Sequence, residues 1–539
     1  MKCRVSFSSI GSWRFLRWAG LAAVAPALWA CTSRTLEAPT ITPTRTVHLT
    51  TNQKINNELD LLFMIDNSSS MQSMQQKLLA QLPVFMQVLQ ALPMGLPSLH
   101  VAVVSEDMGA HSDSSIQCTE LGDDGAFKSA PTGACLGTTL TAGSTFMTDV
   151  NGVANFTDPI GTVFQCIGLL GTSGCGFEHQ LASIDRALGA DELGPLPSTN
   201  ANFLRPEAYL GIVMLTNEDD ASAPQNTTVF SLNGYPQDMT NPDGPLANYR
   251  QNGGPRGTHL CQDPTSANPT AYIAEPIAIP PDAQGTTAAP TLNLVNCKDN
   301  DSSSSAFTPV SQFVSDIKAL KPDPDNQILV AGIIAPTTPV EIGWYLKTGQ
   351  NAAGQQVQEL FPDEMHSCGA QGGSEVSPNP ITDSGPNFFQ SATKFTTDGS
   401  FGDPGIREAQ FIKAFPNNFV ASICDPDYAS SMANIAQKLG QLLKPPCITD
   451  TLQKDTLGNP ICTVIEHLTD MQGNKKDLAI QDCAENGNTA PCWSLVPGGT
   501  TCPNGSQINV TDPANANPAS ESSTVECSLC LPGFTQPGC

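Results

Sequence analysis

The sequence predicts an α/β protein organised around a doubly wound, mostly parallel sheet, with long disulfide-stapled insertions and a small cysteine-rich C-terminal module. Short apolar runs without alternation recur along the chain, and such runs are typical of strands buried on both faces of a sheet. They alternate with helical patterns, which favours parallel pairing. The predicted strands are residues 61–65, 99–105, 208–216, 328–334 and 419–423, and the predicted helices are residues 78–92, 181–188, 313–320, 405–415 and 432–442.

The first 30 residues have the features of a signal peptide. Four basic residues precede an apolar run at 19–30, which is too short to span a bilayer. The run ends in Leu28-Trp29-Ala30-Cys31, which resembles the lipobox of bacterial lipoproteins. This resemblance implies a lipid anchor on Cys31 and export to the outer membrane, the periplasm or the cell surface. Cleavage at a nearby site without lipidation is the alternative.

Acidic side chains dominate the charge of this protein. The 539 residues include 51 Asp and Glu but only 25 Lys and Arg, a formal net charge of −26. Such a chain repels nucleic acid and anionic lipid, so no nucleic-acid partner is expected, and membrane contact would depend on the lipid anchor. Residues 31–55 are rich in Thr and Pro and are expected to form a tether between the anchor and the folded domain.

The cysteines predict a disulfide framework. Apart from Cys3 and Cys31, the 18 cysteines fall into two equal groups, one within residues 118–424 and one within residues 447–539. An even number in an exported chain is most simply explained by disulfides. The second group defines residues 447–539 as the C-terminal module. Spacing does not fix the connectivity; near pairs such as Cys118 with Cys135, Cys166 with Cys175, and Cys261 with Cys297 are guesses.

A polar cluster directly follows the first predicted strand. Asp66, Ser68 and Ser70 alternate along a loop that leads into an amphipathic helix. In open α/β sheets, loops at the carboxyl ends of strands bind ligands. Three oxygen side chains at this spacing can converge on one point, and they suit Mg²⁺, Mn²⁺ or Ca²⁺ better than zinc. The stretch 301–305 has the same spacing, but we predict no buried strand before it and interpret it as a serine-rich loop.

Residues 63–71, Phe-Met-Ile-Asp-Asn-Ser-Ser-Ser-Met, resemble the metal-ion-dependent adhesion site of von Willebrand factor A (VWA) domains. This resemblance implies a doubly wound α/β domain over residues 56–446 that binds a protein partner through the metal. A carboxylate of the partner would complete the coordination of the ion. Mg²⁺ is the expected cation, with Ca²⁺ or Mn²⁺ as alternatives. The resemblance covers the core of the domain and not the insertions at about 106–164, 221–307 and 337–403.

The other two ligand loops depart from the pattern of the resembled family. Near the position of its second-loop threonine stands Glu178, which is either a ligand or a first-turn residue that matches the helix dipole. Asn217 stands where the third loop of the family has an aspartate, so weaker metal binding is expected. Asp219 is a candidate replacement, and an ordinary acidic loop is the alternative.

No pattern in the sequence indicates an enzyme. Metalloprotease, hydrolase-elbow, P-loop and dinucleotide motifs are absent, and the seven histidines lack ligand spacing. Two functions remain. The first is a lipid-anchored adhesion protein of the cell envelope that engages a protein partner through a metal ion. The alternative is a structural envelope protein that has a VWA-like fold and a degenerate, metal-free site.

Overall fold

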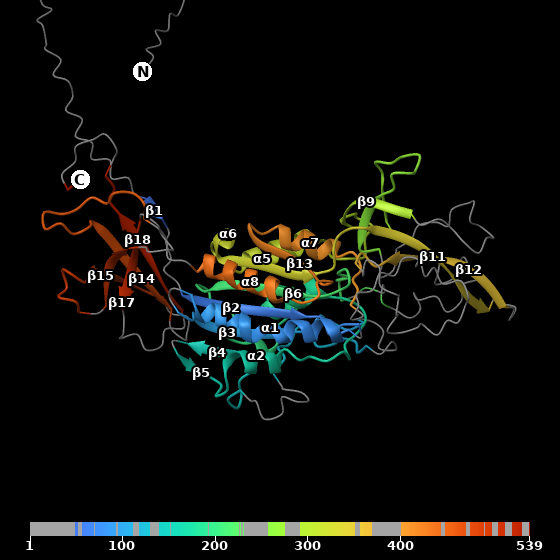
Figure 1. Ribbon diagram of the computed structural model, residues 1–539, viewed down its shortest axis with the longest axis horizontal. Helices are drawn as coiled ribbons and strands as arrows, with labels where there is room; N and C mark the ends of the chain where they lie inside the picture. The colour runs from blue at the N-terminus through green and yellow to red at the C-terminus, as the bar shows by residue number, and fades with distance from the viewer. Residues whose placement is uncertain are drawn as a thin grey trace, which may run out of the picture. The chain divides into compact units, whose positions relative to one another are not determined.

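In the computed structural model the protein is a mixed α/β structure whose described residues form three sheets (Figure 1). Several disulfides are also present. The predicted signal peptide, Cys31 and most of the predicted tether lie outside the described residues. The structure describes residues 49–51, 57–68, 70–92, 95–110, 118–129, 140–150, 152–191, 193–225, 227, 230, 257–274, 292–350, 356–368, 400–443, 448–469, 475–489, 491–497, 505–511, 520–530 and 538–539.

The largest sheet contains all five predicted strands. Its order is β13-β10-β6-β2-β3-β4-β5. The first five strands in this order pair in parallel, and the short β4 and β5 extend the sheet with antiparallel pairing. The strands are β2 (Glu58–Ile65), β3 (Ser98–Val104), β4 (Met147–Val150), β5 (Val153–Ala154), β6 (Tyr209–Leu215), β10 (Ile328–Ile334) and β13 (Asn417–Ser422).

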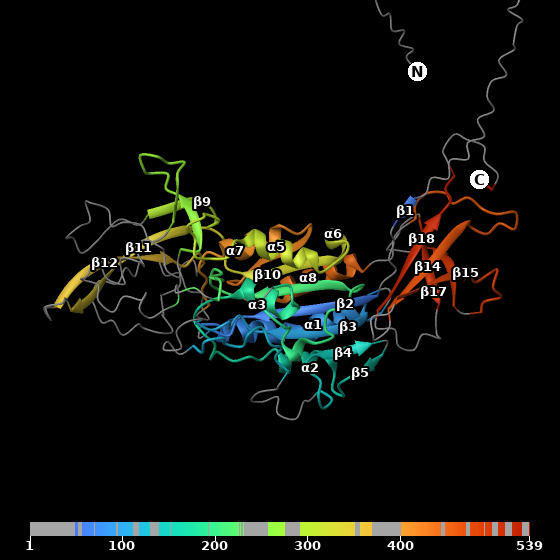
Figure 2. The same cartoon turned by 180° about the vertical axis from the view of Figure 1, so that it is seen from behind.

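Helices pack on both faces of this sheet. Alternate side chains of β2 point to opposite faces, so Leu61 and Phe63 belong to one apolar cluster and Leu62 and Met64 to another. The first cluster includes side chains of α1 (Gln72–Gln90), α2 (Ile160–Ile167) and α8 (Ala429–Leu442). The second includes side chains of α3 (Gln180–Leu188), α5 (Val310–Ala319) and α7 (Ile406–Lys413). Figure 2 shows the protein from behind, with these three helices labelled. Burial on both faces explains why the strands are continuous apolar runs.

The predicted helices are confirmed, but the insertions contain structure that we did not predict. α2 begins inside the first insertion, and α6 (Pro324–Gln327) precedes β10. The second and third insertions together form an antiparallel sheet, whose strands the sequence analysis did not predict. Its order is β12-β11-β9-β7-β8, with β7 (His259–Gln262), β8 (Tyr272–Ala274), β9 (Leu292–Asp299), β11 (Val340–Gln350) and β12 (Gln356–Met365).

The disulfides confirm one predicted pair and correct two. Cys261 and Cys297 join β7 to β9, as their spacing suggested. Cys118 bonds to Cys175, so the guesses that paired Cys118 with Cys135 and Cys166 with Cys175 were both wrong. The error has a physical cause, because the fold brings the loop after β3 next to the segment before α3. Nearness along the chain does not report that contact.

A third sheet is built mainly from the C-terminal module. Its order is β1-β18-β14-β15-β16-β17, and disulfides join Cys462 to Cys527, Cys483 to Cys492, and Cys530 to Cys539. The edge strand β1 comes from the predicted tether and pairs with β18, Leu49 opposite Cys527. The strands are β1 (Leu49–Thr51), β14 (Cys462–Thr469), β15 (Lys475–Asp482), β16 (Cys492–Pro497), β17 (Ser506–Thr511) and β18 (Ser520–Cys527). None of the helices in the described ranges is both long and apolar enough to cross a membrane.

Candidate metal site

The polar loop that follows β2 is fixed to the neighbouring strand β6. The backbone N–H of Asp66 donates to the carbonyl of Leu215 at 3.0 Å. Asp66 is fully buried, and α1 begins at Gln72 after the loop. The loop therefore lies at the carboxyl ends of two adjacent parallel strands, which is where α/β sheets place their ligands.

Hydrogen bonds from the loop after β2 and from the loop after β6 hold the Asp66 carboxylate. Its Oδ1 accepts a bond from the backbone N–H of Ser68 at 2.8 Å, and its Oδ2 accepts one from the Thr216 hydroxyl at 2.8 Å. Burial raises the pKa of Asp66, and these hydrogen bonds act in the opposite direction. The side chain is thus oriented before any ligand arrives.

Three further predicted oxygens lie beside each other. The hydroxyls of Ser68 and Ser70 are 3.2 Å apart, and the Ser70 hydroxyl donates to Asn217 Oδ1 at 3.2 Å. Adjacent ligands of an octahedral ion with bonds of 2.0–2.1 Å are separated by about 3 Å, so this spacing is compatible with a shared cation. Ser68 and Asn217 are buried, whereas Ser70 is only partly buried.

A cluster of three buried carboxylates forms the anionic part of the site. Ligand atoms of Asp66, Glu106 and Glu178 all lie within 4.8 Å of one another. Burial, followed by the charge of Asp66, raises the pKa of both Glu106 and Glu178 well above the usual value. Both carboxylate oxygens of Glu178 are buried without a hydrogen-bond donor among the described residues. Since uncompensated buried charges are costly, this donor set fits a divalent cation.

Glu106 was missed by the sequence analysis, although the sequence contained a signal. It stands one residue after the predicted strand at 99–105 and therefore at the same edge of the sheet as Asp66. The alternative interpretation, that Glu178 matches the helix dipole, stays a prediction, because Glu178 directly precedes the N-cap of α3. α3 begins at Gln180 with His179 as its N-cap, so Glu178 lies outside the first turn.

Three contacts hold the Glu178 segment against the other loops. The Cys118–Cys175 disulfide joins it to the chain after β3, and the backbone N–H of Cys175 donates to Asp107 Oδ2 at 3.2 Å. The N–H of Gly174 donates to the carbonyl of Asn67 at 2.9 Å. These contacts bring Glu178 to the loop that carries Asp66.

Asp219, the sixth predicted metal-site residue, takes part in a different cluster. Its carboxylate accepts hydrogen bonds from Thr258 Oγ1 at 2.6 Å, from His259 Nδ1 at 3.0 Å and from the backbone N–H of Arg407 at 2.8 Å. Burial alone would raise the pKa of Asp219, but the bonds from these donors hold it below the usual value. The structure thus groups Asp219 with the second insertion and not with Asp66.

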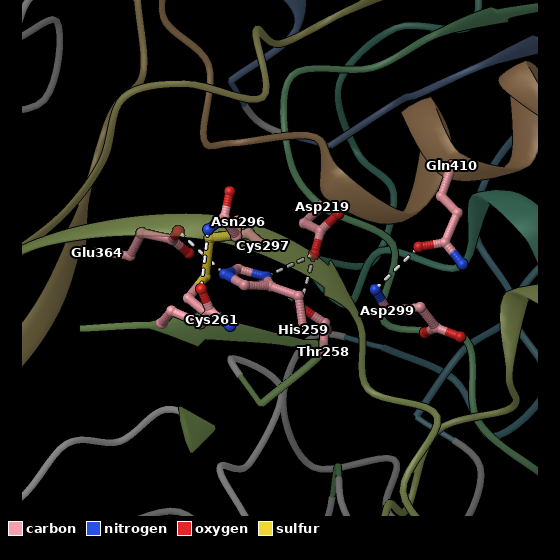
Figure 3. Close-up of a disulfide and its surroundings, with 10 residues drawn as sticks. Asp219, Thr258, His259, Cys261, Asn296, Cys297, Asp299, Glu364 and Gln410 are labelled. Carbon is pink, nitrogen blue, oxygen red and sulfur yellow. Dashed lines mark hydrogen bonds and ion pairs between the residues drawn. A yellow bond between two sulfur atoms is a disulfide. The ribbon is translucent and has the colours of Figure 1, made fainter. Parts of the chain in front are cut away.

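His259 connects Asp219 to the antiparallel sheet. Figure 3 shows its ring between the carboxylates of Asp219 and Glu364, with Nε2 at 3.4 Å from Glu364 Oε1. Burial opposes protonation of the ring, but these two carboxylates outweigh it and raise the pKa of His259 well above the usual value. The nearby Cys261 and Cys297 form a disulfide, so they offer no thiolate to a metal.

The second Asp-x-Ser-x-Ser stretch does not form a comparable site. A strand precedes it, since β9 ends at Asp299, but as predicted β9 is not a buried strand. β9 mixes buried and exposed side chains, and Asp301 is exposed and paired with Lys298 at 2.8 Å. The stretch is a surface loop.

Comparisons with models of known families and with curated proteins find no match for this chain. Among solved structures, it is similar to two pilus adhesins. SpaC from Lactobacillus rhamnosus GG, in an open conformation, has 9% sequence identity and a TM-score of 0.26, with 89% of this chain and 40% of SpaC covered. RrgA from Streptococcus pneumoniae has 11% identity and a TM-score of 0.25, with 88% of this chain and 56% of RrgA covered.

Proposed function

We propose that this protein is a lipid-anchored binding protein of the cell envelope whose VWA-like domain, at about residues 56–446, engages a protein partner through a divalent cation. One observation carries the proposal. The carboxylates of Asp66 and Glu178 lie together at one edge of the sheet. The side-chain oxygens of Ser68, Ser70 and Asn217 lie beside one another at the same edge. The parallel order β13-β10-β6-β2-β3, with helices on both faces, supports a doubly wound domain of this type.

In this proposal each residue has a separate task. Asp66 supplies a fixed anion, because Ser68 and Thr216 already orient its carboxylate. Ser68, Ser70 and Asn217 add neutral oxygens, and Ser70, the least buried of them, marks the side that a partner would approach. The N-terminal ends of α1 and α3 adjoin the loop and Glu178, and their dipoles offset part of the negative charge. A bound cation supplies a position for a carboxylate of the partner.

Partner capture with and without chelator tests this function. Wild-type protein should retain its envelope partner in Mg²⁺ or Ca²⁺ and lose it in EDTA, while Asp66→Ala should not retain it in either buffer. The core of the domain is formed by apolar side chains of the strands and helices and does not include Asp66, so Asp66→Ala should leave the circular dichroism spectrum nearly unchanged. Equal capture by both proteins in EDTA would rule out the metal-dependent mechanism.

One observation favours the second candidate, a structural envelope protein without a metal. Asp66 and Asn217 already accept hydrogen bonds within the protein, from Ser68, Thr216 and Ser70. Metal analysis of the purified wild-type protein and of Asp66→Ala distinguishes the two candidates. A stoichiometric divalent ion in the wild type alone supports the binding protein.

The lipid anchor is a separate part of the proposal and rests on the Leu28–Cys31 motif. Mass spectrometry of the mature protein should find a lipidated N-terminal Cys31. The Cys31→Ser variant should leave the membrane fraction, whereas an unmodified N-terminus at another residue would remove the anchor from the proposal.

A further inference from the structure

We propose that Glu106 is a ligand of the same cation, and that the three carboxylates make this site selective for Ca²⁺ over Mg²⁺. This inference rests on the metal site of the proposed function and specifies its ion. It adds a residue that follows β3 and lies outside the three ligand loops of the sequence motif.

The first argument is geometric. Glu106 follows β3, which pairs directly with β2, so its side chain reaches the end of β2 from the adjacent strand. Ca²⁺ binds oxygens at 2.3–2.6 Å, so two ligands on opposite sides of the ion are about 5 Å apart. The ligand atoms of Asp66, Glu106 and Glu178 meet this limit, since all lie within 4.8 Å of one another.

The second argument is the missing partner of Glu178. Glu178 is 4% exposed, and neither of its carboxylate oxygens has a hydrogen-bond donor in the part of the chain that the structure describes. A carboxylate in this position loses its hydration without compensation. A cation between Glu178, Glu106 and Asp66 would compensate all three groups at once.

The neighbours of Glu106 hold it in place for this role. The backbone N–H of Asn67 donates to Glu106 Oε2 at 2.7 Å. With its amide nitrogen turned towards Glu106, the Asn67 side chain donates to the two carboxylate oxygens at 2.8 and 2.9 Å. Hydrogen bonds of this kind orient metal ligands and leave further lone pairs for the ion.

The third argument concerns the choice of ion. Mg²⁺ usually keeps several water molecules and binds one or two carboxylates, whereas Ca²⁺ takes six to eight oxygens and accepts carboxylates in one-atom or two-atom contact. Asp66 and Glu106 are fully buried and Glu178 nearly so, so bulk water does not hydrate these three carboxylates. Three carboxylates with additional hydroxyl and amide oxygens therefore suit Ca²⁺, and its larger shell still leaves a position for a partner.

The test uses Glu106→Gln, with Glu120→Gln on an exposed position as the matched control. Glutamine keeps the shape and can still accept the bond from Asn67, but it removes one buried charge. CaCl₂ and MgCl₂ are titrated calorimetrically into the metal-free full-length proteins, and thermal unfolding is followed with and without each ion. The wild type and the control should bind Ca²⁺ at least about tenfold more tightly than Mg²⁺.

Glu106→Gln should weaken Ca²⁺ binding by at least about tenfold, because ligand charge sets affinity in such sites. Its metal-free form should unfold at the same or a higher temperature than the wild type, since it loses charge repulsion, and Ca²⁺ should raise that temperature less. A purely structural role would instead lower the unfolding temperature of the metal-free form. If Glu106→Gln does not fold, Glu106→Asp, which withdraws the carboxylate, must weaken Ca²⁺ binding.

The outcomes separate this inference from the proposed function. Equal affinity of the wild type for both ions, or unchanged Ca²⁺ binding by Glu106→Gln, overturns the inference and leaves a metal-dependent binding protein intact. Absence of binding of either ion by the wild type overturns both.

Discussion

Asn67 and Gly174 are so close that the structure leaves no room for a side chain at residue 174. A Cβ at Gly174 would lie 2.1 Å from the terminal amide atom of Asn67 that faces Glu106, and the Gly174 N–H already donates to the Asn67 carbonyl. Asn67 in turn donates to Glu106. This glycine therefore allows the segment that carries Glu178 to approach the loop that carries Asp66.

Gly174→Ala should disturb the metal site more than its small size suggests. The added methyl group must displace the Asn67 side chain, and overpacking of this kind costs about 1–3 kcal/mol. We expect lower thermal stability and weaker Ca²⁺ binding, measured by thermal unfolding and calorimetry. Gly176→Ala is the control, because a Cβ there meets nothing within 4 Å. Equal behaviour of the two variants would contradict the prediction.

Asn217→Asp should tighten metal binding if Asn217 is a ligand. Its Oδ1 lies 3.2 Å from the Ser70 hydroxyl, and its Nδ2 is buried without a hydrogen-bond partner among the described residues. An aspartate would add a charge to the site, so we expect about tenfold higher affinity and a less stable metal-free protein. Calorimetric titration measures the affinity, and thermal unfolding measures the stability of the metal-free protein. Unchanged affinity would exclude Asn217 from the ligand set.

The Cys118–Cys175 disulfide should stabilise both the fold and the site. It closes a loop with a sequence separation of 57, for which chain entropy predicts about 4 kcal/mol. The double substitution Cys118→Ala/Cys175→Ala should lower the free energy of unfolding by up to this amount and weaken metal binding. The pair Cys530–Cys539, in the C-terminal module, provides the control. Its removal should leave metal affinity unchanged, and an equal loss in both variants would refute the positioning role.

The His259 cluster should make stability depend on pH. Asp219 and Glu364 raise the pKa of His259 above its usual 6.5, although burial opposes this. A raised folded-state pKa stabilises the protein fully below the unfolded-state value, and the effect is lost as pH rises through the folded-state pKa. The difference in unfolding temperature between wild type and His259→Gln should therefore be largest below about pH 6.5 and shrink at higher pH.

The control for the pH prediction is a histidine with an exposed partner. His467 Nδ1 lies 2.8 Å from Oδ1 of Asp477, whose side chain is 68% exposed. Exposed ion pairs contribute about 0–1 kcal/mol, so His467→Gln should change stability little at any pH. Breaking a buried pair costs about 3–5 kcal/mol, which is the scale expected for His259→Gln at low pH. A pH-independent difference for His259→Gln would contradict the protonated state of the ring.

The sequence predicted the buried elements well and the exposed ones poorly, for a physical reason. Strands β2, β3, β6 and β10 are buried along their whole length, and their apolar runs are local signals. The edge strand β13 is only partly buried, and a short apolar run still predicted it. Strand β9 mixes buried and exposed side chains, and its pairing with β11 depends on residues far along the chain. No local pattern reports such pairing, so the sheet of the insertions was missed.

The residues of the candidate site were likewise predicted where a local pattern indicates them and missed where the contact depends on strand order. Asp66, Ser68 and Ser70 share one loop, and their spacing alone suggested convergence. The contribution of Glu106 depends on β3 being the neighbour of β2, which the order of elements in the sequence does not establish. Asp219 stands two residues after Asn217, yet the donors Thr258, His259 and Arg407 draw its carboxylate into another cluster. Position in the sequence therefore led us to include Asp219 in the metal site and to miss Glu106.

The pairing of β1 with β18 has a consequence for biosynthesis. Leu49 is among the first described residues to leave the ribosome, and its partner Cys527 is among the last. The seven-stranded sheet needs no residue beyond Ser422, so it can form while the partner of β1 has not yet been made. β1 must wait with unpaired backbone groups until β18 arrives, and contacts of such long sequence separation form slowly. Interrupted synthesis would thus release chains that have a complete central sheet and an open edge at the C-terminal module.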